Sequence, residues 1–394
     1  MQRRRFLATA CAGILAPGLA DGRGLAPAAE ESKPADVDSM LESIRKAHDL
    51  PALAGAVIKE GRTAAAGAVG VRKYGDKTPV TLNDQFHLGS CTKSMTATLA
   101  GMFIEEGKLR WDSTLAETLP AMAAKMHPDL RAVTLEQLLQ HRSGQTEDSD
   151  PAAGPLWKLI DEKKLPNEPR QQRAAYAEMI LAEEPASKPG STYEYSNRNY
   201  ALAGVILESI ADKPWEELIT ERLFRPLGMK TAGFGAMGTP GKIDQPWQHQ
   251  MAFFGLVRLP VEPGPKADNP PAIGPGATVH CSIGDWTKYL RCHVRPKGDG
   301  ALPKGNLLKP ETYRRLHTPS FGGNYAGGWR VLHRAWAGGR VLTHSGSNTM
   351  NFAVAWLAPL RDCAVLAMTN QGGPQAAEAC DEVCSGLIVK FLKP

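Results

Sequence analysis

The sequence predicts an α/β protein in which one β-sheet is interrupted along the chain by a long helical insertion. Strand-like apolar runs lie near both ends of the chain, and segments with helical spacing separate them. The 394 residues are 42% hydrophobic and 22% charged, which is the ordinary composition of a globular protein. This composition argues against a disordered, collagen-like, coiled-coil or multi-span membrane chain.

The first half of the chain contains the first strands and the start of the insertion. Residues 36–48 have helical spacing, and residues 52–58 and 63–71 read as two strands joined by a turn. A helix begins near Ser90 and stops at Gly107. Further helices are predicted from a capping box at Thr134, at 172–182, at 199–210 and at 215–224, the last one started by Pro214 and ended by Pro226.

The second half returns to strands after a long irregular stretch. Residues 232–276 are rich in glycine and proline and show little periodicity, which predicts a loop that forms a rim or a lid. Four strands follow and a helix closes the chain, at 328–333, 340–344, 352–357, 363–368 and 375–392.

The N-terminus is typical of an export signal. Arg3, Arg4 and Arg5 precede a short apolar run that ends near Ala20, and small-residue cleavage patterns follow. The run is too short for a membrane-spanning helix, which needs about 20 apolar residues. The Arg-Arg-x-Phe-Leu pattern favours a twin-arginine signal over an ordinary Sec leader. We therefore assign residues 1–28 to an export signal and expect a bacterial periplasmic or secreted protein with no stable membrane span.

Most of the positive charge belongs to this leader. The whole chain carries a formal net charge of +5. Four of its 46 basic residues and one of its 41 acidic residues lie in residues 1–28, which leaves a net charge of +2. No clustered basic face is visible in the remainder, so nucleic acid is not an expected partner.

The cysteines and histidines do not predict a metal site. His280-Cys281 and Cys292-His293 resemble a set of four ligands, but the sequence between them reads as a helix with Ser282 as its N-cap. Eleven helical residues separate the two cysteines by about 16 Å, which is too far for one metal ion or one disulfide. No metal and no cofactor is expected.

The first candidate for chemistry is the Ser-x-x-Lys sequence at Ser90 and Lys93. A spacing of three residues puts both side chains on one helix face, about 5–6 Å apart at Cβ. The helix N-terminus favours negative charge, and a lysine amine that is shielded from water can be neutral and act as a base. The pair predicts a serine nucleophile with a lysine activator, although Ser-x-x-Lys alone is a weak signal.

The second candidate is Tyr195-Ser196-Asn197. The phenol of Tyr195 can relay a proton where nearby cations stabilise its anion, and the amide of Asn197 can both donate and accept a hydrogen bond. Taken alone, this stretch reads as a turn followed by the start of a helix. His141, which lies in another turn, is interpreted as a structural residue.

The third candidate is His344-Ser345-Gly346-Ser347, at the end of a predicted strand. Gly346 allows a substrate to approach the strand edge closely. The backbone N–H of Ser347 can then join that of Ser90 as an oxyanion hole.

In this order, the three motifs resemble the fingerprint of the serine β-lactamase and penicillin-binding-protein superfamily, which is Ser-x-x-Lys, Tyr- or Ser-x-Asn, and a Lys-Thr-Gly-like triplet. The tyrosine form resembles the branch of class C β-lactamases, D,D-peptidases and esterases. The resemblance covers about residues 36–390, and it implies an antiparallel sheet flanked by helices. It also implies an all-helical subdomain at about 95–275, with the site between the two parts. The surrounding stretches that agree are 86–90, 138–144, 195–200, 223–229 and 285–289.

The resemblance implies a role for each motif residue. Ser90 is the acylated nucleophile, Lys93 and Tyr195 share the general base and acid work, and Asn197 holds the substrate. The N–H groups of Ser90 and Ser347 form the oxyanion hole. Which of Lys93 and Tyr195 accepts the first proton stays open.

One departure from the family pattern bears on function. The third motif begins with His344 where the family has a lysine, and histidine is largely neutral near pH 7. His344, Ser345 and Gly346 are still expected to contact the substrate. We therefore rank an esterase or a D,D-peptidase or amidase above a true class C-like β-lactamase. A further alternative is a penicillin-binding sensor without turnover. The expected partner is a small-molecule or peptide substrate, cell-wall fragments included.

Overall fold

The structure is a computed structural model that describes residues 35–146, 154–252, 255–294 and 307–392. The predicted export signal, residues 1–28, lies outside the described residues. Within the described residues, no helix is both long and apolar enough to cross a bilayer.

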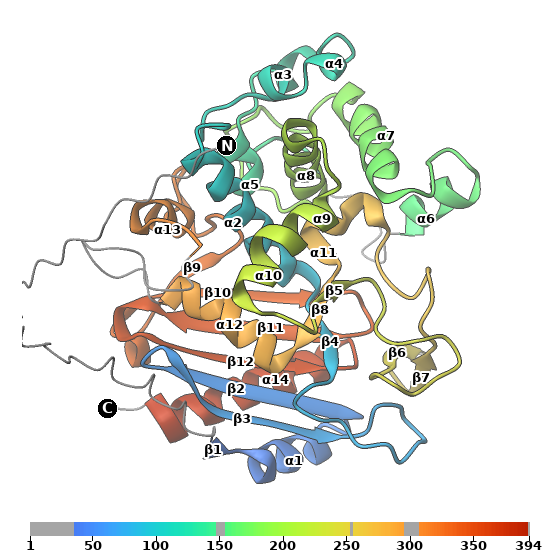
Figure 1. The fold of residues 1–394 in the computed structure, drawn as a ribbon, viewed down its shortest axis with the longest axis vertical. Helices are drawn as coiled ribbons and strands as arrows, with labels where there is room; N and C mark the ends of the chain where they lie inside the picture. The colour runs from blue at the N-terminus through green and yellow to red at the C-terminus, as the bar shows by residue number, and fades with distance from the viewer. Residues whose placement is uncertain (1–34, 147–153, 253–254, 295–306, 393–394) are drawn as a thin grey trace, which may run out of the picture. The chain divides into compact units, whose positions relative to one another are not determined.

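A seven-stranded sheet joins the two ends of the described chain (Figure 1). All neighbouring strands are antiparallel except the first pair, β1 with β3, which is parallel. The sheet combines strands from both ends of the chain, because β2 from the N-terminal half pairs with β12 from the C-terminal half. In spatial order the strands are β1 (Ala35–Asp36), β3 (Arg62–Gly70), β2 (Ala52–Lys59), β12 (Cys363–Thr369), β11 (Phe352–Ala358), β10 (Gly339–Ser347) and β9 (Arg330–Arg334). The predicted antiparallel sheet with a helical insertion is confirmed.

The two faces of this sheet are buried in two separate hydrophobic cores. Successive residues of a strand point to opposite faces, so Leu53 and Val57 of β2 belong to one core and Ala54 and Ala56 to the other. Helices α1 (Asp38–Ala47) and α14 (Pro374–Leu387) cover the first face. Because both faces are covered, the strands read as nearly continuous apolar runs rather than alternating ones.

The second face carries α12 (Ile283–Val294) and the helical part of the chain. The nucleophile motif enters this part through the turn η1 (Gly89–Cys91), which continues into α2 (Thr92–Glu105). Figure 1 shows this part above the sheet. Its other helices are α3 (Leu115–Thr118), α4 (Pro120–Ala123), α5 (Leu135–Leu139), α6 (Gly154–Asp161), α7 (Pro169–Ala182), α8 (Asn197–Ala211), α9 (Trp215–Ile219) and α11 (Gly274–Ala277).

The prediction that a helix at 215–224 ends at Pro226 is wrong. After α9 the chain makes a wide π-helical turn at Thr220–Phe224 and continues as α10 (Arg225–Leu227). Pro226 is tolerated because it lies in the first turn of α10, where a backbone N–H needs no helical partner. Gly228, with φ of +64°, ends the helix instead.

The segment 232–276 has more structure than the predicted loop. It contains β5 (Gly233–Phe234) and a hairpin of β6 (Gln248–Ala252) and β7 (Val257–Val261). Strand β5 joins β4 (Gln85–His87) and β8 (Val279–Ser282) in a three-stranded sheet. These strands show no apolar periodicity in the sequence because they are short and only partly buried.

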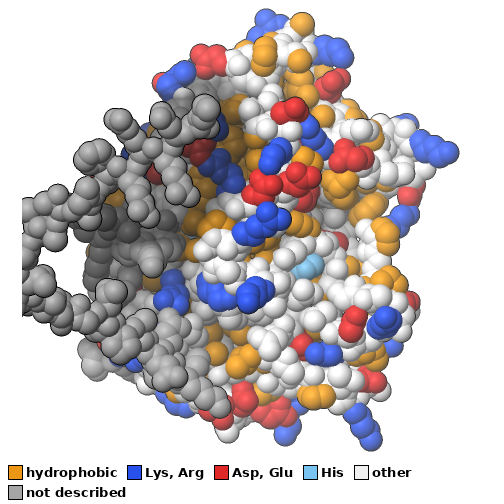
Figure 2. Space-filling model, in the orientation of Figure 1, with side chains coloured by type: hydrophobic (Ala, Val, Ile, Leu, Met, Phe, Trp, Pro, Cys, Tyr) orange, Lys and Arg blue, Asp and Glu red, His pale blue; other side chains and the backbone are white. Residues whose placement is uncertain are grey.

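On the face that Figure 2 shows, Lys and Arg side chains are interspersed with Asp and Glu side chains, so neither sign of charge covers this face. This agrees with the near-neutral charge of residues 29–394.

Candidate active site

Ser90 and Lys93 meet at the start of α2, as the spacing predicts. The Nζ atom of Lys93 lies 3.0 Å from Oγ of Ser90 and donates a hydrogen bond to it. Lys93 is fully buried, whereas Ser90 keeps part of its surface exposed. The arrangement leaves the hydroxyl open to a substrate and holds the amine behind it.

Two further acceptors fix the amine of Lys93. Its Nζ donates to Oδ1 of Asn197 at 2.6 Å and to the carbonyl of Gly276 at 3.0 Å. Asn197 is the first residue of α8, and Gly276 belongs to α11. The first and second motifs are therefore in direct contact, although more than 100 residues separate them in sequence.

Tyr195 lies beside this pair, in the turn that precedes α8. The ring centroid of Tyr195 is 4.8 Å from Nζ of Lys93, within range of a cation–π contact. Ser196 caps α8 by accepting a hydrogen bond from the N–H of Arg198 at 3.2 Å. The predicted turn and helix start are thus confirmed, and the cap holds Tyr195 and Asn197 toward Lys93.

His141 packs against this turn and hydrogen-bonds to it, which agrees with its interpretation as a structural residue. It adopts a left-handed conformation with φ of +57°, and its Nδ1 accepts a hydrogen bond from the N–H of Ser196 at 3.2 Å. Its ring also packs on the ring of Tyr195 at a centroid distance of 4.4 Å. Burial, with a smaller contribution from the positive charge of Lys93, holds the pKa of His141 well below its ordinary value.

The third motif lies on β10, which extends three residues beyond its predicted end. There the backbone of Gly346 and Ser347 runs directly against the turn that carries Ser90. A Cβ added to Gly346 would lie 2.5 Å from the backbone N of Ser90, and a Cβ added to Gly89 would collide with the backbone N of Ser347. This close approach brings the backbones of Ser90 and Ser347 together, as an oxyanion hole requires.

His344 is neutral in this site. Burial, helped by the positive charge of Lys93, lowers its pKa to about 3. Its Nδ1 lies 2.6 Å from the carbonyl of Ser345, which accepts the ring proton, so Nε2 is an acceptor. The hydroxyl of Tyr325 donates to that Nε2 at 3.0 Å.

Sequence reasoning missed Tyr325. This fully buried phenol lies within 6.2 Å of the ring of Tyr195 and within 4.7 Å of the ring of His141, centroid to centroid. It follows the Gly322-Gly323 turn and belongs to no motif of the fingerprint. The sequence signal for it was the density of glycine around an aromatic residue, at Gly322, Gly323, Gly327 and Gly328.

The cysteine and histidine sequences at 280–293 are separated by a helix, as expected. They occupy β8 and α12, and the N–H of Asp285 donates to Oγ of Ser282 as the capping box predicts. Cys91, Cys281, Cys292, Cys363, Cys380 and Cys384 are buried free thiols. Within the described ranges, no three His, Cys, Asp or Glu side chains gather as a metal site.

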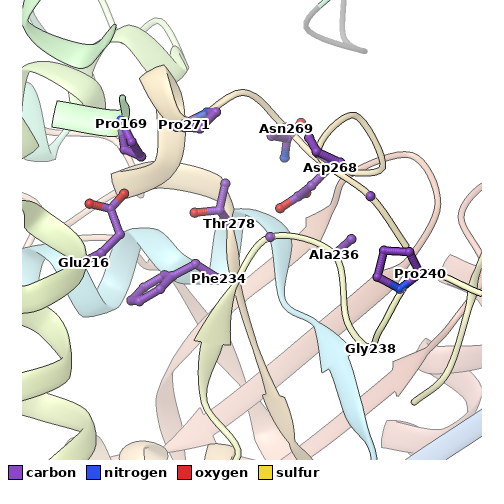
Figure 3. Close-up of a pocket in the computed structure, with 13 residues that line it drawn as sticks. Pro169, Glu216, Phe234, Ala236, Gly238, Pro240, Asp268, Asn269, Pro271 and Thr278 are labelled. Atoms are coloured by element: carbon purple, nitrogen blue, oxygen red, sulfur yellow. The ribbon is translucent and has the colours of Figure 1, made fainter. Parts of the chain in front are cut away.

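A pocket of about 340 Å³ lies next to the motif residues without including them. Figure 3 shows Glu216 and Asp268 on opposite sides of this pocket, with Thr278 between them. Thr278 is two residues from Gly276, the acceptor for Lys93. Part of the predicted rim, 232–276, therefore lines a cavity whose lining residue Thr278 is close in sequence to the residue that binds Lys93.

Comparison with known proteins assigns the family. A sequence model of the Beta-lactamase family matches residues 37–383. Penicillin-binding protein 4 of Amycolatopsis lactamdurans is 26% identical over 343 residues, which cover 84% of each chain. This chain belongs to the Beta-lactamase family, and it is thus a hydrolase of the superfamily of serine β-lactamases and penicillin-binding proteins.

Solved structures agree on the fold. The octameric penicillin-binding protein homologue from Pyrococcus abyssi superposes with a TM-score of 0.73 at 23% identity, over 90% of this chain and 77% of that one. A D-stereospecific amidohydrolase from Streptomyces sp. gives a TM-score of 0.68 at 20% identity, over 88% of this chain and 98% of that one. The β-lactamase/transpeptidase-like fold inferred from the motifs is confirmed.

Proposed function

We propose that this protein is an exported serine hydrolase that cleaves an ester or an amide through an acyl-enzyme on Ser90. The observation that carries the proposal is the contact of Lys93 Nζ with both Oγ of Ser90 and Oδ1 of Asn197. This contact occurs where the backbones of Gly89 and Ser347 meet. The activity is of the esterase or D,D-peptidase and amidase type.

In the acylation step, Oγ of Ser90 attacks the substrate carbonyl carbon while its proton passes to the neutral amine of Lys93 or to the phenolate of Tyr195. The N–H groups of Ser90 and Ser347 stabilise the negative oxygen of the tetrahedral intermediate. The carbon–oxygen or carbon–nitrogen bond then breaks, and the leaving group takes up the proton. Asn197 orients the substrate beside the nucleophile.

In the deacylation step, a water molecule gives a proton to the same basic pair and attacks the ester on Ser90. The second tetrahedral intermediate uses the same oxyanion hole. Its collapse breaks the ester bond, returns a proton to Oγ of Ser90 and releases the acid. Tyr195 and Asn197 are both intact, which favours turnover over a sensor that stays acylated.

The third motif favours esters and amides over β-lactams. The imidazole of His344 is neutral at pH 7, since burial lowers its pKa to about 3. The permanent cation that a lysine would supply at this position is therefore missing. The amidohydrolase among the structural neighbours supports the same ranking.

Arg330 is the cation nearest to the third motif on the neighbouring strand. It is exposed on β9, where it pairs in register with Thr343, the residue before His344. Its positive charge acts to lower the pKa values of His141, Tyr193 and His344, so these three rings lie within its electrostatic influence. We propose that it binds the carboxylate of an anionic acyl donor, as a peptidase substrate would offer.

The test is a kinetic comparison on mature protein. We expect release of p-nitrophenol from a p-nitrophenyl ester, with a mass increase of one acyl group on Ser90 in quenched samples. Ser90→Ala should lose both, while the matched control Ser94→Ala, one turn further along α2, should keep both. Full activity in Ser90→Ala would refute the proposal.

A fluorescent penicillin separates the alternatives. Slow labelling followed by release fits the proposed hydrolase, whereas a stable adduct without ester turnover would favour the sensor. Efficient cephalosporin hydrolysis would favour the class C-like β-lactamase.

Export and domain organisation are part of the proposal. We propose that residues 1–28 are a twin-arginine leader and that residues 36–390 form one hydrolase domain with a helical subdomain at about 95–275. Replacing Arg3 and Arg4 with lysines should leave the protein in the cytoplasm of a bacterial host. Unchanged delivery to the periplasm would count against a twin-arginine leader and for a Sec leader.

A further inference from the structure

A buried carboxylate connects the two backbone segments of the oxyanion hole. Asp268 lies between β7 and α11, is 5% exposed, and comes from the segment that lines the pocket of Figure 3. None of the three catalytic motifs contains it. Its contacts run in two directions, one toward Ser90 and the other toward Ser347.

The first connection runs through His87, the last residue of β4. His87 is fully buried, and its Nε2 lies 2.8 Å from Oδ1 of Asp268. Its Nδ1 accepts a hydrogen bond from the N–H of Gly89 at 3.1 Å. Because Nδ1 accepts, the ring proton lies on Nε2, the atom that contacts Oδ1 of Asp268 without the alignment of a hydrogen bond. This hydrogen bond from Gly89 to Nδ1 fixes the backbone N–H of Gly89, the residue that precedes Ser90.

The second connection runs through Asn348, the residue after Ser347. Nδ2 of Asn348 donates to the same Oδ1 of Asp268 at 3.0 Å and to Oε1 of Gln248 at 2.6 Å. Asn348 is 4% exposed, so both contacts are shielded from water. The end of β10 is thereby tied to the same oxygen atom as the turn before Ser90.

We propose that Asp268 and His87 are positioning residues that set the spacing between the N–H groups of Ser90 and Ser347. This inference rests on the proposed function. An oxyanion hole works only when both donors point at the developing negative oxygen, and misplacement of a reacting group by about 1 Å can cost 100-fold. One carboxylate oxygen that contacts both flanking segments provides such a constraint.

The direct test is the Asp268→Asn variant. The amide keeps the volume but loses the charge that faces His87 and Asn348. We expect kcat/KM for the p-nitrophenyl ester to fall about 10- to 100-fold. Asp244→Asn is the control, because Asp244 belongs to the same 232–276 segment and, among the described residues, hydrogen-bonds within its own turn, to Thr239. It should keep the wild-type value.

A spectroscopic readout separates positioning from loss of fold. In the acyl-enzyme, hydrogen bonds from the oxyanion hole lower the infrared stretching frequency of the ester carbonyl. We expect Asp268→Asn to raise that frequency in the acyl-enzyme on Ser90. His87→Gln, which keeps one acceptor and one donor, should retain more activity than His87→Leu.

The outcomes are distinct. An unchanged carbonyl frequency in a folded, acylated Asp268→Asn variant overturns the positioning role and leaves the proposed function standing, whether or not kcat/KM falls. If Asp268→Asn does not fold, the comparison of His87→Gln with His87→Leu decides, and equal frequencies and rates in both overturn the inference. Absence of an acyl group on Ser90 in the wild-type protein overturns both proposals.

Discussion

His344 shows how burial can change the chemistry of a motif position. The residue is 5% exposed and the pKa of its ring is lowered to about 3, so it carries no charge at neutral pH. We expect His344→Gln to keep the shape of the pH profile of kcat/KM between about pH 5 and pH 8, although the rate falls. Stopped-flow ester hydrolysis across this range measures the profile. Loss of an acidic limb in the variant would show that His344 titrates in catalysis.

Gly346 is a residue at which the close approach of two backbone segments matters for the site. A methyl group there would collide with the carbonyl of Leu88 and press on the N–H of Ser90. We expect Gly346→Ala to lower kcat/KM about 100- to 1,000-fold, the cost of losing one oxyanion donor. Gly284→Ala is the control, because a Cβ at Gly284 meets nothing within 4 Å. Wild-type kinetics in Gly346→Ala would contradict the close approach of β10 to the nucleophile turn.

The residues of the site differ in how visible they are in sequence. Ser90, Lys93, Tyr195 and Asn197 belong to motifs whose order identifies a family, and the structure brings the first, second and fourth into direct contact. The place of Tyr325 in the site could not be predicted from the sequence, because it depends on contacts with rings on other elements.

The Asp268 connection was invisible for a related reason. It joins His87 to a carboxylate far along the chain. No local pattern encodes such a pairing, since either residue alone reads as an ordinary polar residue of a turn or strand.

At the scale of elements, Arg173 of α7 joins four segments. Its guanidinium pairs with Glu208 at 2.6 Å and Glu216 at 2.8 Å, and it donates to the carbonyl of Pro271 at 2.6 Å. Arg173 is fully buried and Glu208 is 3% exposed. The group therefore links α7, α8, α9 and the turn before α11.

We expect Arg173→Met to lower the free energy of unfolding by about 3–5 kcal/mol, because it leaves the Glu208 carboxylate buried without its partner. Urea denaturation measures the change. Arg173→Met combined with Glu208→Gln should recover part of the loss. Lys266→Met, which breaks an exposed pair with Asp161, serves as the control and should change stability little. An effect of similar size in the control would contradict the argument.

Most elements were predictable because their signals are local. The capping box at Thr134 forms as expected and opens α5, and the strands of the main sheet have apolar runs long enough to recognise. The π-helical turn at Thr220–Phe224 and the β6–β7 hairpin were not predictable. Neither has a distinctive residue pattern, and tertiary contacts decide both.

For the whole molecule, buried imidazoles predict acid sensitivity. Burial lowers the pKa of His249 and His280 to about 4, and that of His293 and His344 to about 3, from 6.5. As the pH falls below 6.5, the unfolded chain binds protons that the folded chain does not. This contribution to stability is therefore complete above the unfolded-state pKa of 6.5. It is lost as the pH falls toward the folded-state pKa values.

We expect the urea midpoint to fall from pH 7 to pH 5. The contribution of each fully buried imidazole approaches about 1.4 kcal/mol per pH unit once the pH is well below 6.5. His280→Gln, if folded, should show a shallower pH dependence than the wild-type protein. A midpoint that rises on acidification would show that other groups dominate the linkage.

The pairing of β2 with β12 has a consequence for the order of folding. Lys59 lies opposite Cys363 and Leu53 opposite Thr369, so the central ladder joins residues about 300 positions apart. Closing a loop of that length costs about 5 kcal/mol in chain entropy. A ribosome must deliver almost the entire polypeptide before this ladder can form. Until then one edge of β2 stays open to other chains, and a truncated product that lacks β12 would be prone to aggregation.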